Sequence, residues 1–162
     1  DIPVANNDWW QARVLDNGGV AVPFNQDMLQ QLQDAIEKDA GGTVKLWLPT
    51  HNIRRYYVQS LVANKRYVNT MQLDGGYRAV EFNEIPMVPD RDCTPGRVYG
   101  LDPSLLSIYM GQEWDWIPAN DAGAVLSRLE GYHAYGATMW KAWELGTAYR
   151  NKQGVVKDIQ DS

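Results

Sequence analysis

The hydrophobic period of this sequence changes near Arg66, and this change constrains the fold more than any other feature. Before Arg66, two segments carry apolar residues at the spacing of a helix; after it, apolar and polar residues alternate as they do along a strand. Gly and Pro residues are scattered along the chain, as is typical of turns, and no low-complexity linker separates the two regions. The sequence therefore predicts a mixed α+β fold.

The first helix is predicted over residues 26–38, between a capping residue at Asn25 and a stop at Gly41 and Gly42. Its apolar stripe consists of Met28, Leu29, Leu32, Ala35 and Ile36. A strand over 44–48 follows and is closed by Pro49, which cannot donate to a ladder.

A second helix is expected immediately afterwards, with Thr50 as its cap. Its stripe is Ile53, Tyr56, Tyr57, Ser60 and Leu61, which leaves Arg54, Arg55 and Gln59 for water.

The rest of the chain reads as strands and turns. A hairpin is predicted from 67–68 to 77–82 around the turn Asp74-Gly75-Gly76, followed by an edge-like strand at 85–88 and a strand at 97–101. Asp102-Pro103 has the pattern of a cap that starts a helical turn. Further strands are expected at 107–110, 113–117, 124–129, along 132–150 and at 155–159.

Several classes of function are disfavoured by composition. The formal net charge is −5 and no Lys/Arg block is present, so nucleic-acid binding is not expected. No apolar run approaches the ~20 residues that cross a bilayer. One cysteine cannot form an internal disulfide, which fits synthesis in a reducing cytoplasm.

No metal, cofactor or catalytic motif stands out. His51 and His133 are far apart, and His133 is interpreted as an ordinary strand residue. Cys93 lies among acidic residues that raise the pKa of a thiol, so it is expected to be structural. The glycine pairs beginning at 18, 41 and 75 lack the continuation of a phosphate-binding loop and are predicted to be turns.

The tryptophans leave two readings open. Acidic residues beside stacking aromatics are typical of sugar-binding or glycosidase sites, and the residues concerned are Glu113, Trp114, Asp115, Trp116, Trp140, Trp143 and Glu144. Core packing is the favoured alternative. Met139, Trp143, Leu145 and Tyr149 share one side of the predicted long strand, and a buried Trp143 predicts a loss of about 3–5 kcal/mol in Trp143→Ala.

The order of these segments resembles the C-terminal half of a tailed-bacteriophage major capsid protein, the Hong Kong ninety-seven fold that bacterial encapsulin shells share. The resemblance covers about positions 25 to 160. It rests on the helix, the strand ending in Pro49, the second helix, and then "NKRYVNTMQLDGGYRAVEFNEIPMVPDRDCTPGRVYGLD", "EWDWI" and "GATMWKAWELGTAYRNKQGVVKDI". No one of these segments is diagnostic by itself.

The resemblance implies an axial lobe, with a mixed sheet flanked by helices, and a peripheral lobe rich in antiparallel strands. Residues 1–42 are then a peripheral-lobe segment and helix, 43–120 the axial lobe, and 121–162 the return to the peripheral sheet. Such subunits usually carry an N-terminal arm, an extended loop and a long spine helix before this point. The opening Asp1 agrees with a fragment or a processed chain, and no crosslinking residue is carried over.

The function implied is that of a non-enzymatic, self-assembling shell subunit in the icosahedral head of a phage or prophage, made in the host cytoplasm. An encapsulin-type compartment and a Trp-rich carbohydrate-binding or glycosidase domain are the alternatives. Expected partners are copies of the chain in hexameric and pentameric rings, with scaffolding, portal or decoration proteins besides. No cofactor, membrane or sequence-specific nucleic acid is expected.

Arginine and exposed aromatic side chains are the residue types that anchor interfaces. The candidate subunit contacts are Arg54, Arg55, Tyr57, Arg66, Tyr67, Asp74, Gly75 and Tyr99. The tyrosines Tyr56, Tyr57 and Tyr99 have the alternative of filling the chain's own core. The connection nearest a ring axis is expected at 70–77, with 90–96 as the other choice.

Overall fold

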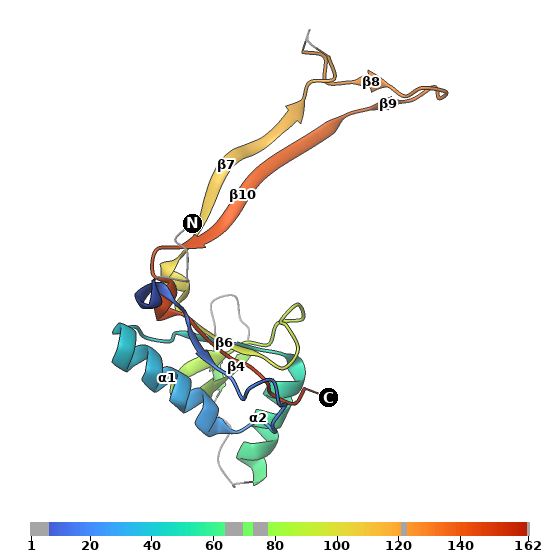
Figure 1. The fold of residues 1–162 in the computed structure, drawn as a ribbon. Helices are drawn as coiled ribbons and strands as arrows, with labels where there is room; N and C mark the ends of the chain where they lie inside the picture. The colour runs from blue at the N-terminus through green and yellow to red at the C-terminus, as the bar shows by residue number, and fades with distance from the viewer. Residues whose placement is uncertain (1–6, 64–69, 73–77, 121–122, 162) are drawn as a thin grey trace. The chain divides into compact units, whose positions relative to one another are not determined.

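The computed structural model describes residues 7–63, 70–72, 78–120 and 123–161. The chain divides into two compact units (Figure 1). Unit 1 comprises Asp1–Leu105 with Ala148–Ser162, and unit 2 comprises Leu106–Thr147. The segments 1–42, 43–120 and 121–162 anticipated for shell lobes remain a prediction.

Unit 1 is built on a mixed sheet, as expected for this fold class. Its strand order in the described residues is β1-β11-β6-β2-β5-β4-β3. The pairs β1–β11 and β2–β5 are parallel and the other pairs are antiparallel. The strands are β1 (Arg13–Leu15), β2 (Leu46–Pro49), β3 (Thr70–Gln72), β4 (Arg78–Phe82), β5 (Ile85–Met87), β6 (Val98–Leu101) and β11 (Gly154–Val156).

Helix α1 (Gln26–Ala40) confirms the first predicted helix and runs two residues further. The Asn25 side chain accepts a hydrogen bond from the Asp27 N–H at 3.2 Å. At the other end Gly41 adopts a left-handed φ of 57°, which glycine tolerates without a Cβ penalty, and its N–H returns to the Glu37 carbonyl.

Helix α2 (His51–Ala63) confirms the second predicted helix. The Thr50 hydroxyl accepts the Ile53 N–H at 3.3 Å, which is the expected cap. Ile53, Tyr57 and Leu61 are buried along its inner face.

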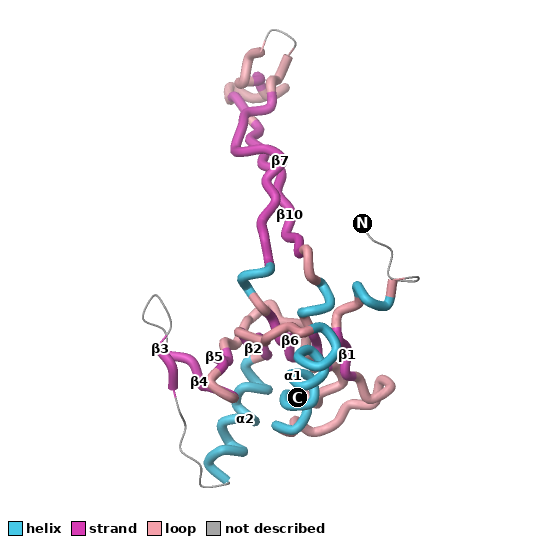
Figure 2. Tube along the Cα trace, turned by 90° about the vertical axis from the view of Figure 1, so that its left-hand side faces the viewer, coloured by secondary structure: helices cyan, strands magenta, loops and turns pink. Residues whose placement is uncertain are grey.

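The two helices share one hydrophobic core with the sheet (Figure 2). Trp47 and Phe82 meet edge to face with ring centroids 6.0 Å apart, and Tyr57 of α2 meets the same Phe82 at 6.1 Å. Leu32 of α1 and the Trp47 ring converge on the backbone of Gly100. Because both helices reach the same group of sheet residues, they cover the same face of the sheet.

Strand β5 corrects one prediction, because it is not an edge strand. It lies between β2 and β4, although it contains Pro86, which lacks an N–H. Its pairing with β2 is limited to the register of Trp47 with Met87, where the Val88 N–H donates to the Trp47 carbonyl at 2.9 Å. Because this pairing is so short, no hydrogen bond to β2 requires an N–H at Pro86.

The ends of the chain were only partly anticipated. Strand β1 was not predicted, and the strand expected over 155–159 ends at Val156, with a separate bridge between Val22 and Ile159. The interruption coincides with Asp158, whose φ of 59° is incompatible with a strand.

Unit 2 is a long antiparallel ribbon of β7 (Leu106–Ile117) and β10 (Thr138–Thr147), with a small pair formed by β8 (Ser127–Arg128) and β9 (Tyr135–Gly136). The two strands predicted at 107–110 and 113–117 are one strand, β7. His133 lies in the exposed connection between β8 and β9, so its assignment to a strand was wrong. Short 3-10 turns lie at Asp8–Trp10, at Pro103–Leu105 as predicted, and at Arg150–Lys152.

Candidate functional site

One face of the ribbon of unit 2 is mainly apolar, with Lys141 placed by strand alternation between Met139 and Trp143 on the same side. Directly paired residues of an antiparallel ladder project to the same side. The register pairs Ile108 with Leu145, Met110 with Trp143 and Trp116 with Met139. These six residues form what we call the apolar ribbon face.

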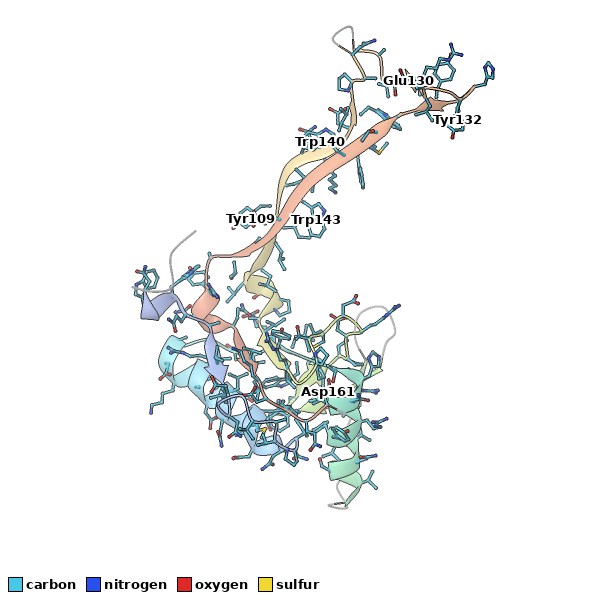
Figure 3. All side chains as sticks on the ribbon, turned by 45° about the vertical axis from the view of Figure 1, so that its right-hand side comes forward. Tyr109, Glu130, Tyr132, Trp140, Trp143 and Asp161 are labelled. Carbon is cyan, nitrogen blue, oxygen red and sulfur yellow. The ribbon has the colours of Figure 1, made fainter. Side chains whose placement is uncertain are left out.

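The opposite face of the ribbon is mixed. There the register pairs Tyr109 with Glu144 and Asp115 with Trp140. Tyr109 and Trp143, one from each face, project to opposite sides of the ribbon in Figure 3. The alternation is therefore that of an amphipathic strand pair.

All six residues of the apolar ribbon face are exposed; Trp143 retains 61% of its accessible surface and Trp116 46%. The expectation that the tryptophans of this region are core residues was therefore wrong. A strand pair buries an apolar face only against a second layer, and the described residues of unit 2 form a single layer. An uncovered apolar surface of this kind marks an interaction site.

In unit 2, Glu113 and Trp114 both lie near Lys141. Glu113 contacts Lys141 at 3.8 Å, and Lys141 lies 6.0 Å from the centroid of Trp114. A hollow of about 530 Å³ is lined by residues 128–133 around the β8–β9 connection, none of which is a tryptophan.

The predicted contact residues of α2 separate into exposed and buried ones. Arg55 is exposed and lies 5.6 Å from the centroid of Tyr56, whereas Arg54 is half-buried. Tyr57 is only 3% exposed, and its hydroxyl donates to the Glu81 carbonyl at 2.6 Å. Tyr57 therefore fills the core of unit 1, the alternative that the sequence left open.

Tyr99 is half-buried on β6, and its hydroxyl donates to the Thr94 hydroxyl at 3.4 Å. The candidates Arg66, Tyr67, Asp74 and Gly75 lie outside the described residues. The contact role of all these residues remains a prediction.

The sequence did not identify the buried carboxylate Asp102 as a polar centre of unit 1. One of its oxygens accepts from the N–H and the hydroxyl of Ser104, at 3.0 and 2.6 Å, and the other lies 3.0 Å from Lys45 Nζ. The Asp102 backbone N–H donates to the Gln153 side chain at 2.8 Å. The sequence marked Asp102 only as a cap.

Burial alone would raise the pKa of Asp102, but the hydrogen bonds from Ser104 and Lys45 outweigh it and set that pKa below its ordinary value. A carboxyl whose pKa is lowered by folding stabilises the fold above its unfolded pKa, about 3.9, and loses that contribution as the pH falls through the folded pKa.

We therefore expect Asp102→Asn to destabilise the protein at neutral pH and to converge with the wild type as the pH falls below about 4. Urea unfolding at several pH values measures the difference. Asp92→Asn, at an exposed loop position, is the matched control. A gap between Asp102→Asn and the wild type that does not change with pH would contradict the assignment.

Cys93 is structural, as predicted. It is buried, and its Sγ lies 3.6 Å from the Leu48 carbonyl. Burial, reinforced by Asp90 and Asp161, raises the pKa of the thiol. A thiol of this kind is a poor nucleophile at neutral pH.

Asp161 connects the chain's last described residues to α2 and to the 90–96 loop. Its carboxylate accepts from the Thr50 hydroxyl at 2.7 Å and from the Gly96 N–H at 3.1 Å. Its backbone carbonyl accepts from the Asn52 amide at 2.9 Å. Across the described residues, no cluster of three metal-ligating side chains occurs, and no helix is long and apolar enough to cross a membrane.

The fold of this chain is similar to the folds of two solved structures. No protein-family model and no curated protein matches the chain. Among solved structures, the capsid asymmetric unit of cyanophage A-1(L) is similar with a TM-score of 0.68 and 19% identity, over 98% of this chain and 53% of that one. The holo-SrpI encapsulin complex of Synechococcus elongatus PCC 7942 is similar with a TM-score of 0.63 and 10% identity, over 93% of this chain and 54% of that one.

These likenesses show the fold, which is the Hong Kong ninety-seven capsid fold shared by the phage capsid and the encapsulin. The chain spans about half the length of each of the two similar chains.

Proposed function

We propose that this chain is a structural subunit of a bacteriophage or prophage capsid, which self-assembles into the shell that encloses the genome, and that it carries out no catalysis. The observation that carries the proposal is the structural match to a cyanophage capsid subunit over nearly the whole chain. The virion is then where the protein resides.

The apolar ribbon face supports an assembling role. Six exposed apolar side chains on one side of a strand pair are costly in water and gain about 25 cal/mol for each Å² that a neighbour covers. Shell subunits need such surfaces, because their work is to present complementary, non-identical contacts that close a ring.

An encapsulin-type compartment is the second candidate, favoured by the match to an encapsulin over 93% of the chain. The phage capsid match has the higher TM-score and identity. Particles that contain a stoichiometric second protein and no DNA would favour the compartment.

The gene that encodes this sequence, expressed in full in a bacterial host, is expected to yield closed particles. Sucrose-gradient sedimentation followed by negative-stain electron microscopy detects them. Protein that never sediments beyond a few subunits, at any concentration or salt, would contradict the proposal.

The exposed indoles also allow a test of the alternative that this chain binds carbohydrate. Titration of oligosaccharides against tryptophan fluorescence is expected to give no saturable change. A saturable change that Trp116→Ala abolishes would favour the sugar-binding function over the shell.

A further inference from the structure

The two helices of unit 1 carry opposite charge. The exposed acidic residues of α1 are Asp27, Asp34, Glu37 and Asp39, against Lys38 as its one basic residue. Helix α2 contains no acidic residue and carries His51, Arg54 and Arg55. The chain as a whole has a net charge of −5, and of the two helices only α2 has a basic face.

Four of these charges oppose the helix dipoles, whereas Asp27 in the first turn of α1 and Lys38 in its last turn agree with them. Glu37 and Asp39 lie in the last turns of α1, where the unpaired carbonyls favour cations. Arg54 and Arg55 lie within the first five residues of α2, whose first turn contains no acid, although that end favours anions. The helix dipoles therefore do not explain the positions of Glu37, Asp39, Arg54 and Arg55.

Neighbouring glutamines bind Asp34 and Glu37 without neutralising them, whereas Asp39 lies 3.7 Å from Arg13 Nε. The Gln30 amide donates to Asp34 at 2.7 Å, and the Gln33 amide donates to Glu37 at 2.9 Å. Their negative charge remains available to a cation from outside.

The arginines of α2 lack a counter-ion among the described residues. Neither Arg54 nor Arg55 forms an ion pair there, and Arg54 Nε is buried without a hydrogen-bond partner. Asp161, the carboxylate bound at the start of α2, is engaged by Thr50 and Gly96.

A hollow of about 310 Å³ adjoins this basic face. It is lined by Pro23, Phe24, Tyr56, Gln59 and Gln160. The amide groups of Gln59 and Gln160 can donate to carboxylate or glutamine oxygens, which occur on the outer face of α1.

The acidic and basic ends lie apart within one chain. The Gln26 amide at the start of α1 donates to the Ser60 hydroxyl near the end of α2, at 2.7 Å. Helix α1 then runs 15 residues, or about 22 Å, away from that contact. Figure 1 places the end of α1 and the start of α2 on opposite sides of unit 1.

We propose that the basic face at the start of α2 docks onto the acidic C-terminal half of α1 in a second copy of the chain. This inference rests on the proposed shell function and names one of its contacts. The two patches are different, so the contact is head-to-tail and generates a ring when its angle closes. The charged pairs set the register, while Tyr56 and its hollow supply contact area.

Charge reversal tests the contact. Arg55→Glu and Glu37→Lys each put like charges opposite one another and are expected to weaken self-association about tenfold in sedimentation equilibrium at low salt. The double reversal restores opposite charges and is expected to return to within about threefold of the wild type. Particle yield from the full gene should follow the same order.

Folding and binding effects are separable, because each single reversal agrees better with its helix dipole than the natural residue does. The melting temperatures of both single variants are therefore expected to equal or exceed that of the wild type. Arg128→Glu, an exposed reversal in β8 of unit 2, lies on neither helix and is the matched control, which should leave association unchanged.

Single reversals that associate as the wild type does, or a double reversal that combines both losses, would overturn the proposed contact. If particles still form in those cases, the shell function stands and only this contact is wrong. If the wild-type chain stays monomeric at every concentration and its full gene gives no particles, both proposals fall.

Discussion

Replacing Trp47 by alanine is expected to lower the free energy of unfolding by about 3–5 kcal/mol, the usual cost of removing a large aromatic from a packed core. The Trp47 side chain is 0% exposed, contacts Phe82 of β4, lies against Gly100 of β6 and belongs to the same core cluster as Leu32 of α1. Chemical denaturation followed by circular dichroism measures the loss. A change below about 1 kcal/mol would mean that the core closes around the cavity.

Two variants sharpen this experiment. Trp143→Ala removes the same side chain from the exposed ribbon and is expected to change stability by less than about 0.5 kcal/mol, in place of the 3–5 kcal/mol that strand alternation suggested. Trp47→Phe should cost less than Trp47→Ala, because it keeps an aromatic ring and removes an indole N–H that is buried without a partner among the described residues.

The second large effect is expected from Gly154→Ala in β11, about 1–3 kcal/mol of destabilisation by overpacking. A Cβ at this position would lie 2.7 Å from Leu32 Cδ1, 2.9 Å from Ile36 Cδ1 and 3.2 Å from the Arg13 carbonyl oxygen. The two side chains are fully buried and the carbonyl belongs to the neighbouring strand, so none of the three can withdraw freely.

Gly111→Ala is the control for Gly154→Ala. Gly111 lies in the ribbon strand β7, and its nearest contacts would be 3.8 Å away, which is ordinary van der Waals distance. Thermal unfolding of both variants should show a lower melting temperature for Gly154→Ala alone. Equal melting temperatures of the two variants would indicate that Leu32 and Ile36 move aside for the added methyl group without loss of stability.

The helices were predictable because their evidence is local. The spacing of Leu29, Leu32 and Ile36, with a cap and a stop, is enough to define α1, and the same argument defines α2. Strand positions were also visible, but strand neighbours were not, since the pairing of β5 with β2 depends on contacts between residues forty positions apart.

The tryptophans show a different limit. Alternation along 138–147 correctly placed Met139, Trp143 and Leu145 on one face, because side-chain direction follows from the strand itself. That face is buried only if a second layer covers it. The spacing of apolar residues within the strand does not tell whether such a layer is present. Arg54 and Arg55 could be proposed from composition, whereas Tyr57 could be assigned to the core only from its contact with Phe82.

The position of β11 has a consequence for the order of events during synthesis. Residues 154–156 insert between β1, made at 13–15, and β6, made at 98–101. Until residues 154–156 have been made, β1 and β6 have no strand between them, and Leu32 and Ile36 of α1 lack their contact with Gly154. Although β1 is the first strand of this sheet to be made, it joins the sheet only after β11 has emerged, because β11 is its partner strand among the described residues.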